Sequence, residues 1–355
     1  GIGASKLWAG INYSQLNTKL EDHNKQYEGK KMPLGVTFAL TFVCNFECAH
    51  CGADIDNKRS KDDMNTELML KTLKEIKAAG GQRISLTGGE PLVKKDITKI
   101  LDTCSENKFY VSLTTNGWHV NRHLESLKKL DLMIVSLDGT EEMHDFIRRK
   151  KGSYKKVIES IKTAKKNNIP VSVNTTVMNT NIDNMPALSK VLKELGVYWT
   201  IDLFLDNMNI KEWQKGSNIG RPTDKLLDQV LKVAKDNPYL INSAHYLNTV
   251  KNKGNTNGSK KCFAGIGYCV ISADGKMYPC FPAQFDKEYV GTDLKKMNFQ
   301  EAFDKLPLYR KSCNTCDYVC HLELNSLYSF NPKSIFRALK YLYKSKILNY
   351  FKKKN

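Results

Sequence analysis

The alternation of short β-rich runs with helical segments constrains the fold of this chain more than any other feature. Six apolar runs with strand character occupy residues 34–43, 83–87, 109–115, 132–138, 171–178 and 197–205. Between them, apolar residues recur three and four positions apart, as at Leu70, Leu73 and Ile76, which is the period of a helix with one buried face. Strands that alternate with helices form parallel sheets with right-handed connections. We therefore predict an α/β fold, a partial (βα)6 TIM-like barrel two strands short of closure.

The loops that follow the predicted strands carry the most unusual residues. A cysteine-rich segment at 44–51 follows the first strand, the segment GGEP at 88–91 follows the second, and Asn116 follows the third. Because the carboxyl ends of parallel strands meet at one rim of a sheet or barrel, these loops should lie close together. The sequence therefore predicts a functional site at this rim.

The segment CNFECAHC contains Cys44, Cys48 and Cys51 with the spacing C-x3-C-x2-C. Structural zinc sites usually take four ligands, and a disulfide framework needs an even number of cysteines. Three thiolates can instead hold three irons of a [4Fe–4S] cluster, whose usual ligand complement is four. The fourth iron then keeps an open coordination position, as catalytic metal centres do.

Composition limits the compartment and the class of partner. The ten cysteines are clustered in a chain of 355 residues that has neither a secretory signal nor an apolar run long enough to span a bilayer. This pattern favours metal binding in a reducing compartment over disulfides, so we expect a cytoplasmic protein. The net charge of +18 comes mainly from lysine, whereas proteins that read nucleic-acid sequence more often use arginine. No specific nucleic-acid partner is expected.

The cysteine triad after the first strand, with GGEP after the second, resembles the radical S-adenosylmethionine (radical SAM) superfamily over about residues 34–205. The resemblance implies an enzyme whose cofactors are a three-cysteine [4Fe–4S] cluster and S-adenosylmethionine. It implies reductive cleavage of S-adenosylmethionine to a 5′-deoxyadenosyl radical, which abstracts hydrogen from an unactivated C–H bond. It also implies an electron donor such as flavodoxin or ferredoxin. It identifies no catalytic residue that reacts with the substrate.

The same resemblance assigns residues to the cofactors. Cys44, Cys48 and Cys51 would bind the catalytic cluster. The contacts implied for S-adenosylmethionine are His50, Gly88, Gly89, Glu90, Asn116, Ser136, Arg148 and Asn174. Arg148 is expected to pair with the cofactor's carboxylate. His50 stands where the family usually has Tyr or Phe, and it is expected to stack on the adenine.

A second group of cysteines begins near a predicted hairpin. Asp274-Gly275 lies between two β-like runs and predicts a two-residue turn, and this register places Cys269 opposite Cys280. Together with Cys262 and the later group, these cysteines resemble the SPASM/twitch extension of radical SAM enzymes. That resemblance implies at least one auxiliary [4Fe–4S] cluster.

The auxiliary ligands come from six cysteines, namely Cys262, Cys269, Cys280, Cys313, Cys316 and Cys320. Four of them fit a fully ligated cluster best, namely Cys262, Cys280, Cys313 and Cys316. Cys269 and Cys320 are rivals for two of these places. A zinc knuckle is the alternative, because a hairpin followed by C-x-x-C also describes zinc ribbons.

The predicted organisation has five parts. They are an N-terminal extension at 1–33, the barrel core at 34–206, a helix and linker at 207–261, the cysteine-rich module at 262–322, and a basic amphipathic tail at 323–355.

The composition of the basic tail suggests a class of substrate. Residues 333–355 contain eight basic residues and no acid, and apolar residues from Phe336 to Tyr350 recur at helical spacing. This pattern is typical of a helix that lies on an anionic membrane. It predicts peripheral membrane association and a lipid or lipid-linked substrate. One alternative is a peptide-modifying (RiPP-type) maturase, although about 33 residues before the first strand are too few for a leader-binding domain. The other alternative is a zinc protein that binds nucleic acid.

Overall fold

The computed structural model describes residues 31–51, 62–204, 220, 222, 224–251, 262–286, 289–307 and 325. Within these residues, no helix combines the length and apolar character needed to cross a membrane. The basic tail, apart from Asn325, lies outside the described residues, as do Cys313, Cys316 and Cys320.

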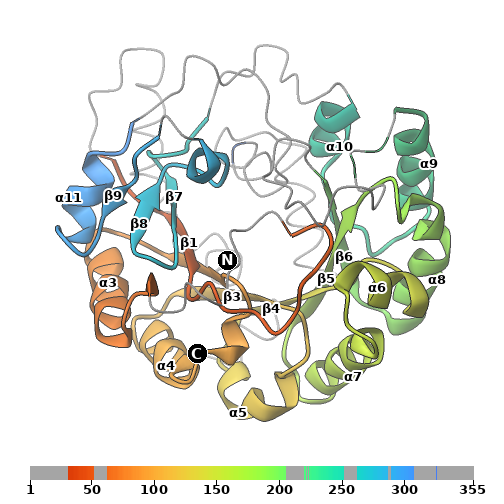
Figure 1. The fold of residues 1–355 in the computed structure, drawn as a ribbon, viewed down its shortest axis with the longest axis horizontal. Helices are drawn as coiled ribbons and strands as arrows, with labels where there is room; N and C mark the ends of the chain where they lie inside the picture. Colours follow the sequence, from red (N-terminus) through yellow and green to blue (C-terminus); the bar gives the residue numbers. More distant parts are fainter. Residues whose placement is uncertain are drawn as a thin grey trace, which may run out of the picture.

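The core of the protein is a curved parallel sheet (Figure 1). Its six central strands are β1 (Gly35–Ala39), β2 (Arg83–Thr87), β3 (Tyr110–Thr115), β4 (Leu132–Ser136), β5 (Val171–Val177) and β6 (Tyr198–Leu203). Each strand pairs in parallel with the next one in the sequence. The predicted partial barrel is confirmed, with each of the six strands inside its predicted run.

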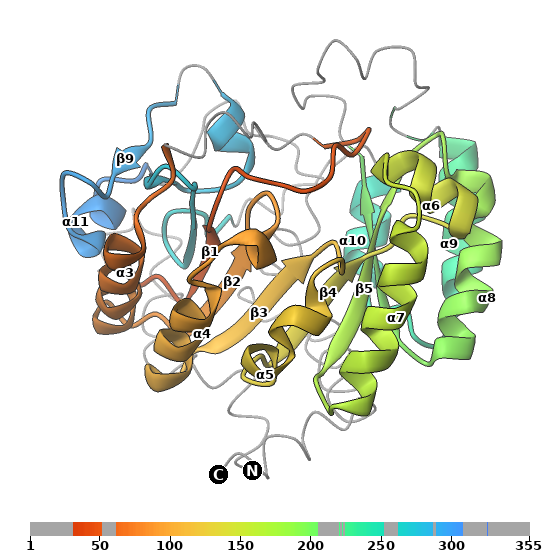
Figure 2. The ribbon, with the colours of Figure 1, turned by 60° about the horizontal axis from the view of Figure 1, so that its bottom comes forward.

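Helices form an arc around the outside of this sheet, and Figure 2 shows α4, α5 and α7 along its outer face. They are α3 (Thr66–Ala78), α4 (Ile97–Glu106), α5 (Leu124–Leu127), α6 (Glu141–Arg148), α7 (Ser153–Lys166), α8 (Met185–Leu195), α9 (Asp224–Lys235), α10 (Ala244–Lys251) and α11 (Phe299–Asp304). Short 3-10 turns are η3 (Pro91–Val93), η4 (Val120–His123), η5 (Ile182–Asn184) and η7 (Pro282–Phe285). Local sequence determines where some of these helices begin and end. The side chain of Asn65 accepts a hydrogen bond from Leu68 N at the start of α3, and Gly196 ends α8 with φ +56°.

The strands have two chemically different faces. On the outer face, side chains such as Met133 and Val135 of β4 are fully buried with the helices in one hydrophobic core. Because side chains alternate along a strand, the intervening residues face the inside of the barrel. The inward polar residues include Thr37, Ser85, Ser112, Thr114, Ser136, Asn174, Thr176 and Thr200. The inner face of the sheet therefore carries many hydroxyl groups and the amide of Asn174, together with apolar residues such as Leu132 and Ile134 of β4.

Three further strands extend the sheet beyond β1. They are β7 (Tyr268–Ile271), β8 (Lys276–Tyr278) and β9 (Thr292–Asp293). β7 pairs in parallel with β1, while β8 and β9 continue the sheet in antiparallel fashion. The predicted cysteine-bearing hairpin thus lies at the edge of the barrel sheet, beside β1 (Figure 1). Its sequence alone does not indicate this position.

The predicted register of this hairpin is wrong by one residue. Val270 pairs with Tyr278, and Ser272 N donates to Lys276 O at 2.8 Å, which leaves a three-residue loop. Gly275 closes the loop with φ +87°, as expected for the left-handed third residue of such a loop. A tertiary contact also holds the loop, because Met64 N donates to the carbonyl of the buried Ala273. Cys269 consequently does not face Cys280.

Trp199 of β6 is expected to be a major stabilising side chain of the outer core. It is fully buried, and its indole N–H donates to Thr175 Oγ1 at 2.8 Å. Trp199→Ala should lower the free energy of unfolding by about 3–5 kcal/mol, because it leaves a large cavity and removes a hydrogen bond to the buried Thr175 Oγ1, which keeps only its own bond to Leu137 O. Urea unfolding followed by circular dichroism measures the change. Val290→Ala is the control, since Val290 is exposed; equal losses in both variants would contradict the assignment.

Candidate functional site

The loop after β1 is held by the loop after β2. The amide of Gly89 donates to Thr41 O at 2.7 Å, and the amide of Glu90 donates to Val43 O at 2.9 Å. Glycine is needed for this approach: Gly88 has φ +139°, and a Cβ on Gly89 would lie 2.1 Å from Val43 O. The predicted proximity of the two loops is confirmed.

Glu90 anchors these loops from inside the protein. Its carboxylate accepts hydrogen bonds from Asn116 N at 2.7 Å, from Thr115 Oγ1 at 2.8 Å and from Leu92 N at 3.0 Å. Burial raises the pKa of Glu90 to about 7, although the three hydrogen bonds act in the opposite direction. The side chain thus joins the end of β2 to the end of β3.

Asn116 links the third loop to the cysteine segment. Its Nδ2 donates to Asn45 Oδ1 at 2.8 Å, and its Oδ1 accepts from Trp118 N at 3.0 Å. Both polar atoms of the side chain therefore have partners within the protein. Contact between Asn116 and S-adenosylmethionine stays a prediction.

The three cysteines of the first loop form no disulfide. Cys44 and Cys48 are buried and Cys51 is half-buried, and all three lie in a small hydrophobic cluster with Phe46 and Trp118. The two aromatic rings meet edge to face, with centroids 5.6 Å apart. Burial raises the pKa of Cys44 to about 12 and also raises that of Cys48. Among the described residues, no group of three His, Cys, Asp or Glu side chains is placed to hold a single metal ion.

A buried ion pair lies beside Cys48. Arg148 Nε is 2.6 Å from Asp138 Oδ2, and Arg148 Nη1 donates to Cys48 Sγ at 3.7 Å. Burial disfavours ionised Asp138, but Arg148, His50 and His144 together with a hydrogen bond from the Thr176 amide hold the pKa of Asp138 below its usual value. Asp138 was missed from the sequence, although an acid directly after β4 was a usable signal.

His50 belongs to the same buried group. Its Nε2 lies 3.8 Å from Asp138 Oδ2. Burial lowers the pKa of His50 to about 4, with Arg148 acting in the same direction and Asp138 against it. The imidazole is therefore neutral near pH 7. Its stacking on adenine stays a prediction.

Ser136 and Asn174 lie next to each other on the lumen face. They are register partners on β4 and β5, and both are half-buried. Asn174 Oδ1 accepts a hydrogen bond from Thr200 Oγ1 at 2.8 Å. The structure thus brings two predicted cofactor contacts together inside the barrel.

The described auxiliary cysteines fall into two environments. Cys262 and Cys280 are half-buried and pack against one small cluster that includes Phe263 and Tyr268. Cys269 is fully buried in the main barrel core, where burial raises the pKa of its thiol. The structure therefore brings Cys262 and Cys280 to the same cluster and separates Cys269 from them. The remaining three predicted ligands lie outside the described residues.

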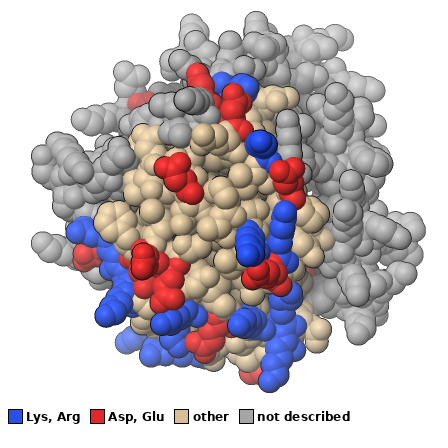
Figure 3. Space-filling view, turned by 90° about the vertical axis from the view of Figure 1, so that its right-hand side faces the viewer, with Lys and Arg blue, Asp and Glu red and all other residues tan. Residues whose placement is uncertain are grey.

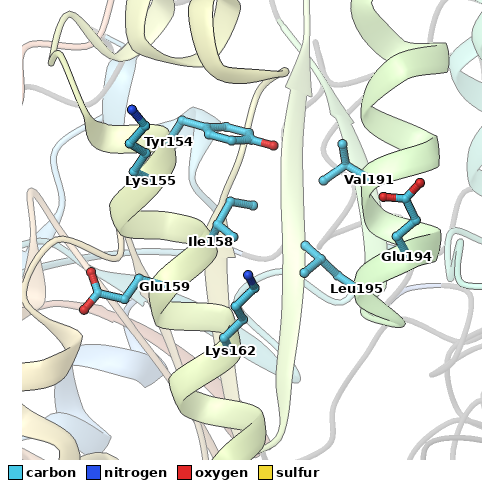
Figure 4. Close-up of a pocket in the computed structure, with 8 residues that line it drawn as sticks. All are labelled: Tyr154, Lys155, Ile158, Glu159, Lys162, Val191, Glu194 and Leu195. Carbon is cyan, nitrogen blue, oxygen red and sulfur yellow. The ribbon is translucent and has the colours of Figure 1, made fainter.

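The outer surface offers a different kind of feature. A groove of about 520 Å³ lies between α7 and α8, lined by residues such as Tyr154, Ile158 and Leu195 (Figure 4). It contains none of the predicted site residues. On the face drawn in Figure 3, basic and acidic side chains are interspersed rather than separated into a single basic patch.

Comparison with known proteins gives the following likenesses. Residues 38–192 match the Radical SAM superfamily. The AdoMet-dependent heme synthase of Methanosarcina barkeri is 23% identical over 319 residues, which cover 81% of this chain and 89% of that protein. The PqqA peptide cyclase of Bradyrhizobium diazoefficiens is 24% identical over 75% of this chain and 71% of its own length. Streptococcus suis SuiB bound to the precursor peptide SuiA has a similar fold, with a TM-score of 0.63 and 16% identity over 87% of this chain and 74% of SuiB.

The buried carboxyl group of Glu90 should make stability depend on pH. Its folded-state pKa of about 7 lies above the ordinary value of 4.5, so its contribution is complete below pH 4.5 and is lost as the pH rises through 7. Glu90→Gln should remove this decline, while costing about 1–3 kcal/mol through mismatched hydrogen bonds. Urea unfolding of the metal-free protein from pH 5 to pH 8 measures both effects. Glu125→Gln, at an exposed site, should keep the wild-type slope. An unchanged slope in Glu90→Gln would show the assignment to be wrong.

Proposed function

We propose that this chain, a radical SAM enzyme with a [4Fe–4S] cluster and S-adenosylmethionine as cofactors, abstracts hydrogen from a C–H bond of a peptide substrate. One observation carries the proposal: three cysteines that form no disulfide share a buried loop at the carboxyl end of β1, at the rim of a barrel whose inner face carries hydroxyl and amide groups. The proposed ligands of the catalytic cluster are Cys44, Cys48 and Cys51.

The environment of these thiols suits a cluster. Burial opposes ionisation of Cys44 and Cys48, so a thiolate in this loop needs positive charge beside it, which iron supplies. When bound, the cluster and S-adenosylmethionine supply a 5′-deoxyadenosyl radical. The chain itself holds the thiols in place through the backbone of the Gly89 loop and the side chain of Asn116. Phe46 and Trp118 exclude water from one side of the loop.

The lumen supports a polar substrate over a lipid chain. Half-buried polar side chains on the inner face, such as Ser136, Asn174 and Thr176, can exchange hydrogen bonds with the N–H and C=O groups of a peptide. A hydrocarbon chain would remove them from water without replacing those bonds. The names of relatives point the same way: one is a PqqA peptide cyclase, and SuiB was solved with its precursor peptide. Peptide modification therefore takes first place over the lipid substrate predicted from the tail. Membrane binding by the tail stays a prediction.

A tetrapyrrole is the second candidate substrate. It is favoured by the likeness to the AdoMet-dependent heme synthase, which extends over 89% of that enzyme. Both candidates use the same cluster and the same rim of the barrel, so the proposed ligands are common to them.

We also propose an auxiliary [4Fe–4S] cluster bound by Cys262, Cys280, Cys313 and Cys316. Cys262 and Cys280 pack against the same small hydrophobic cluster at the edge of the sheet, which supports two of these ligands. The position of Cys269 in the barrel core favours a packing role for it, leaving Cys320 as the rival ligand.

The cysteine assignments predict the iron content and the cleavage of S-adenosylmethionine. Anaerobically reconstituted protein should hold about eight irons per chain in two clusters. It should release 5′-deoxyadenosine when S-adenosylmethionine and dithionite are added. Cys44→Ala, Cys48→Ala and Cys51→Ala should each reduce 5′-deoxyadenosine to background, because the catalytic cluster loses a ligand.

Cys104→Ala is the matched control. Cys104 is a fully buried thiol of α4 that packs in the main hydrophobic core and not in the cluster of the cysteine loop, so its loss should leave cleavage intact. Sustained 5′-deoxyadenosine release from any of the three loop variants would remove that cysteine from the ligand set. Bound zinc with no iron would favour the zinc-protein alternative.

The two candidate substrates predict different products. The reconstituted enzyme is incubated separately with a peptide encoded beside its gene and with Fe-coproporphyrin III, the tetrapyrrole in the name of another similar protein of Methanosarcina barkeri, the Fe-coproporphyrin III synthase. Each mixture is analysed by mass spectrometry. A mass change in the peptide that accompanies 5′-deoxyadenosine release is expected. A change in the tetrapyrrole alone would give the second candidate first place.

A further inference from the structure

We infer that Asp138 and Arg148 form a positioning pair for the catalytic cluster, in which Asp138 fixes the Arg148 guanidinium so that one N–H is directed at the sulfur of Cys48. This inference rests on the proposed assignment of Cys48 as a cluster ligand. It gives Arg148 a different role from the carboxylate contact that the sequence predicts.

The geometry at Cys48 comes from the end of α6. Arg148 is the last residue of that helix, and its Nη1 donates to Cys48 Sγ at 3.7 Å. One residue earlier, the carbonyl of Ile147 accepts a hydrogen bond from Ala49 N at 2.8 Å. The cysteine loop is therefore tied to α6 at two consecutive positions, one through its backbone and one through its sulfur.

Asp138 is held more firmly than an ordinary surface partner. It is fully buried, and Oδ1 accepts from Thr176 N at 3.0 Å. Its own N–H donates to His144 Nδ1 at 3.1 Å, and its carbonyl accepts from Asn181 Nδ2 at 2.9 Å. A contact from β5 thus holds the carboxylate, while contacts from α6 and from the segment after β5 hold the Asp138 backbone. Oδ2 forms an ion pair with Arg148 Nε at 2.6 Å, which keeps the guanidinium beside this carboxylate.

The arrangement has a specific electrostatic consequence. Asp138 balances the charge of Arg148, which makes burial of the guanidinium tolerable. The Nη1–H group of Arg148 still donates to Cys48 Sγ. Hydrogen bonds to the sulfur atoms of an iron–sulfur cluster help to set its reduction potential. A donor at the sulfur stabilises the added negative charge of the reduced cluster, and the effect is strong where the surroundings exclude water. Arg148 should therefore make the cluster easier to reduce.

The test is a redox titration of the reconstituted enzyme followed by electron paramagnetic resonance. The catalytic cluster is the one whose signal changes when S-adenosylmethionine is added. Arg148→Met should shift the reduction equilibrium at least tenfold toward the oxidised cluster, which for a one-electron couple is 59 mV. Arg148→Lys should shift it in the same direction, because a lysine lacks the planar fork.

Two control variants separate this effect from simpler ones. Lys150→Met removes a cation that lies 5.2 Å from the Trp118 ring but does not contact Cys48. It should change the reduction equilibrium constant by less than twofold. A shift equal to that of Arg148→Met would mean that Arg148 acts only through its long-range charge. Asp145→Asn weakens the packing of α6 against α7, where Asp145 accepts from Ser153 Oγ and Tyr154 N. It should lower stability without moving the potential.

The role of Asp138 is tested by a double-mutant cycle. In the Asp138→Asn background, Arg148→Lys should produce less than a third of the shift that it produces in wild type, because both side chains carry one positive charge and the guanidinium is no longer held at the sulfur. An equal or larger shift in that background would overturn the positioning pair. Failure of the ligand assignment is distinguishable: Cys48→Ala would then retain the full iron content and the signal that responds to S-adenosylmethionine.

Discussion

The hydrogen bonds from the amides of Gly89 and Glu90 to the carbonyls of Thr41 and Val43 hold the site together. They continue the pairing of β1 and β2 past the end of the regular sheet, so the cysteine loop begins from a fixed backbone. The approach is so close that a side chain at position 89 would collide with the backbone at Val43. Glycine at this position is thus a steric requirement.

The alternation of side chains along each strand gives the barrel an apolar outer face and a more polar inner face. The outer face of each strand joins the helices in a continuous apolar core, as Met133, Val135 and Trp199 illustrate. The inner face carries hydroxyl and amide groups such as Ser136 and Asn174. Such groups can lie on the inner face because the apolar packing of the strands is completed by the helices on the outer face.

Buried ionisable side chains are concentrated where the loops meet, and they have hydrogen-bond donors or an oppositely charged group beside them. Glu90 has three hydrogen-bond donors around it, and Asp138 faces Arg148 across a 2.6 Å ion pair. Charges in such surroundings are costly unless paired, so each pair specifies one arrangement of the chain around it. Glu90 joins the loops after β2 and β3, and Arg148 joins the segment after β4 to the cysteine loop after β1.

The sequence by itself determined the periodic features of this protein. Six strand runs, their order and the convergence of the first three loops followed from apolar spacing, because that spacing reflects burial along one continuous segment. The cysteine spacing and GGEP likewise predicted the candidate site, whose two loops the structure brings together. Only the tertiary structure decided contacts between residues distant in the chain. The pairing of β7 with β1 and the three-residue hairpin loop held by Met64 depend on such contacts. So does the position of Arg148 between Asp138 and Cys48, since which partner a buried charge takes is settled by the packing around it.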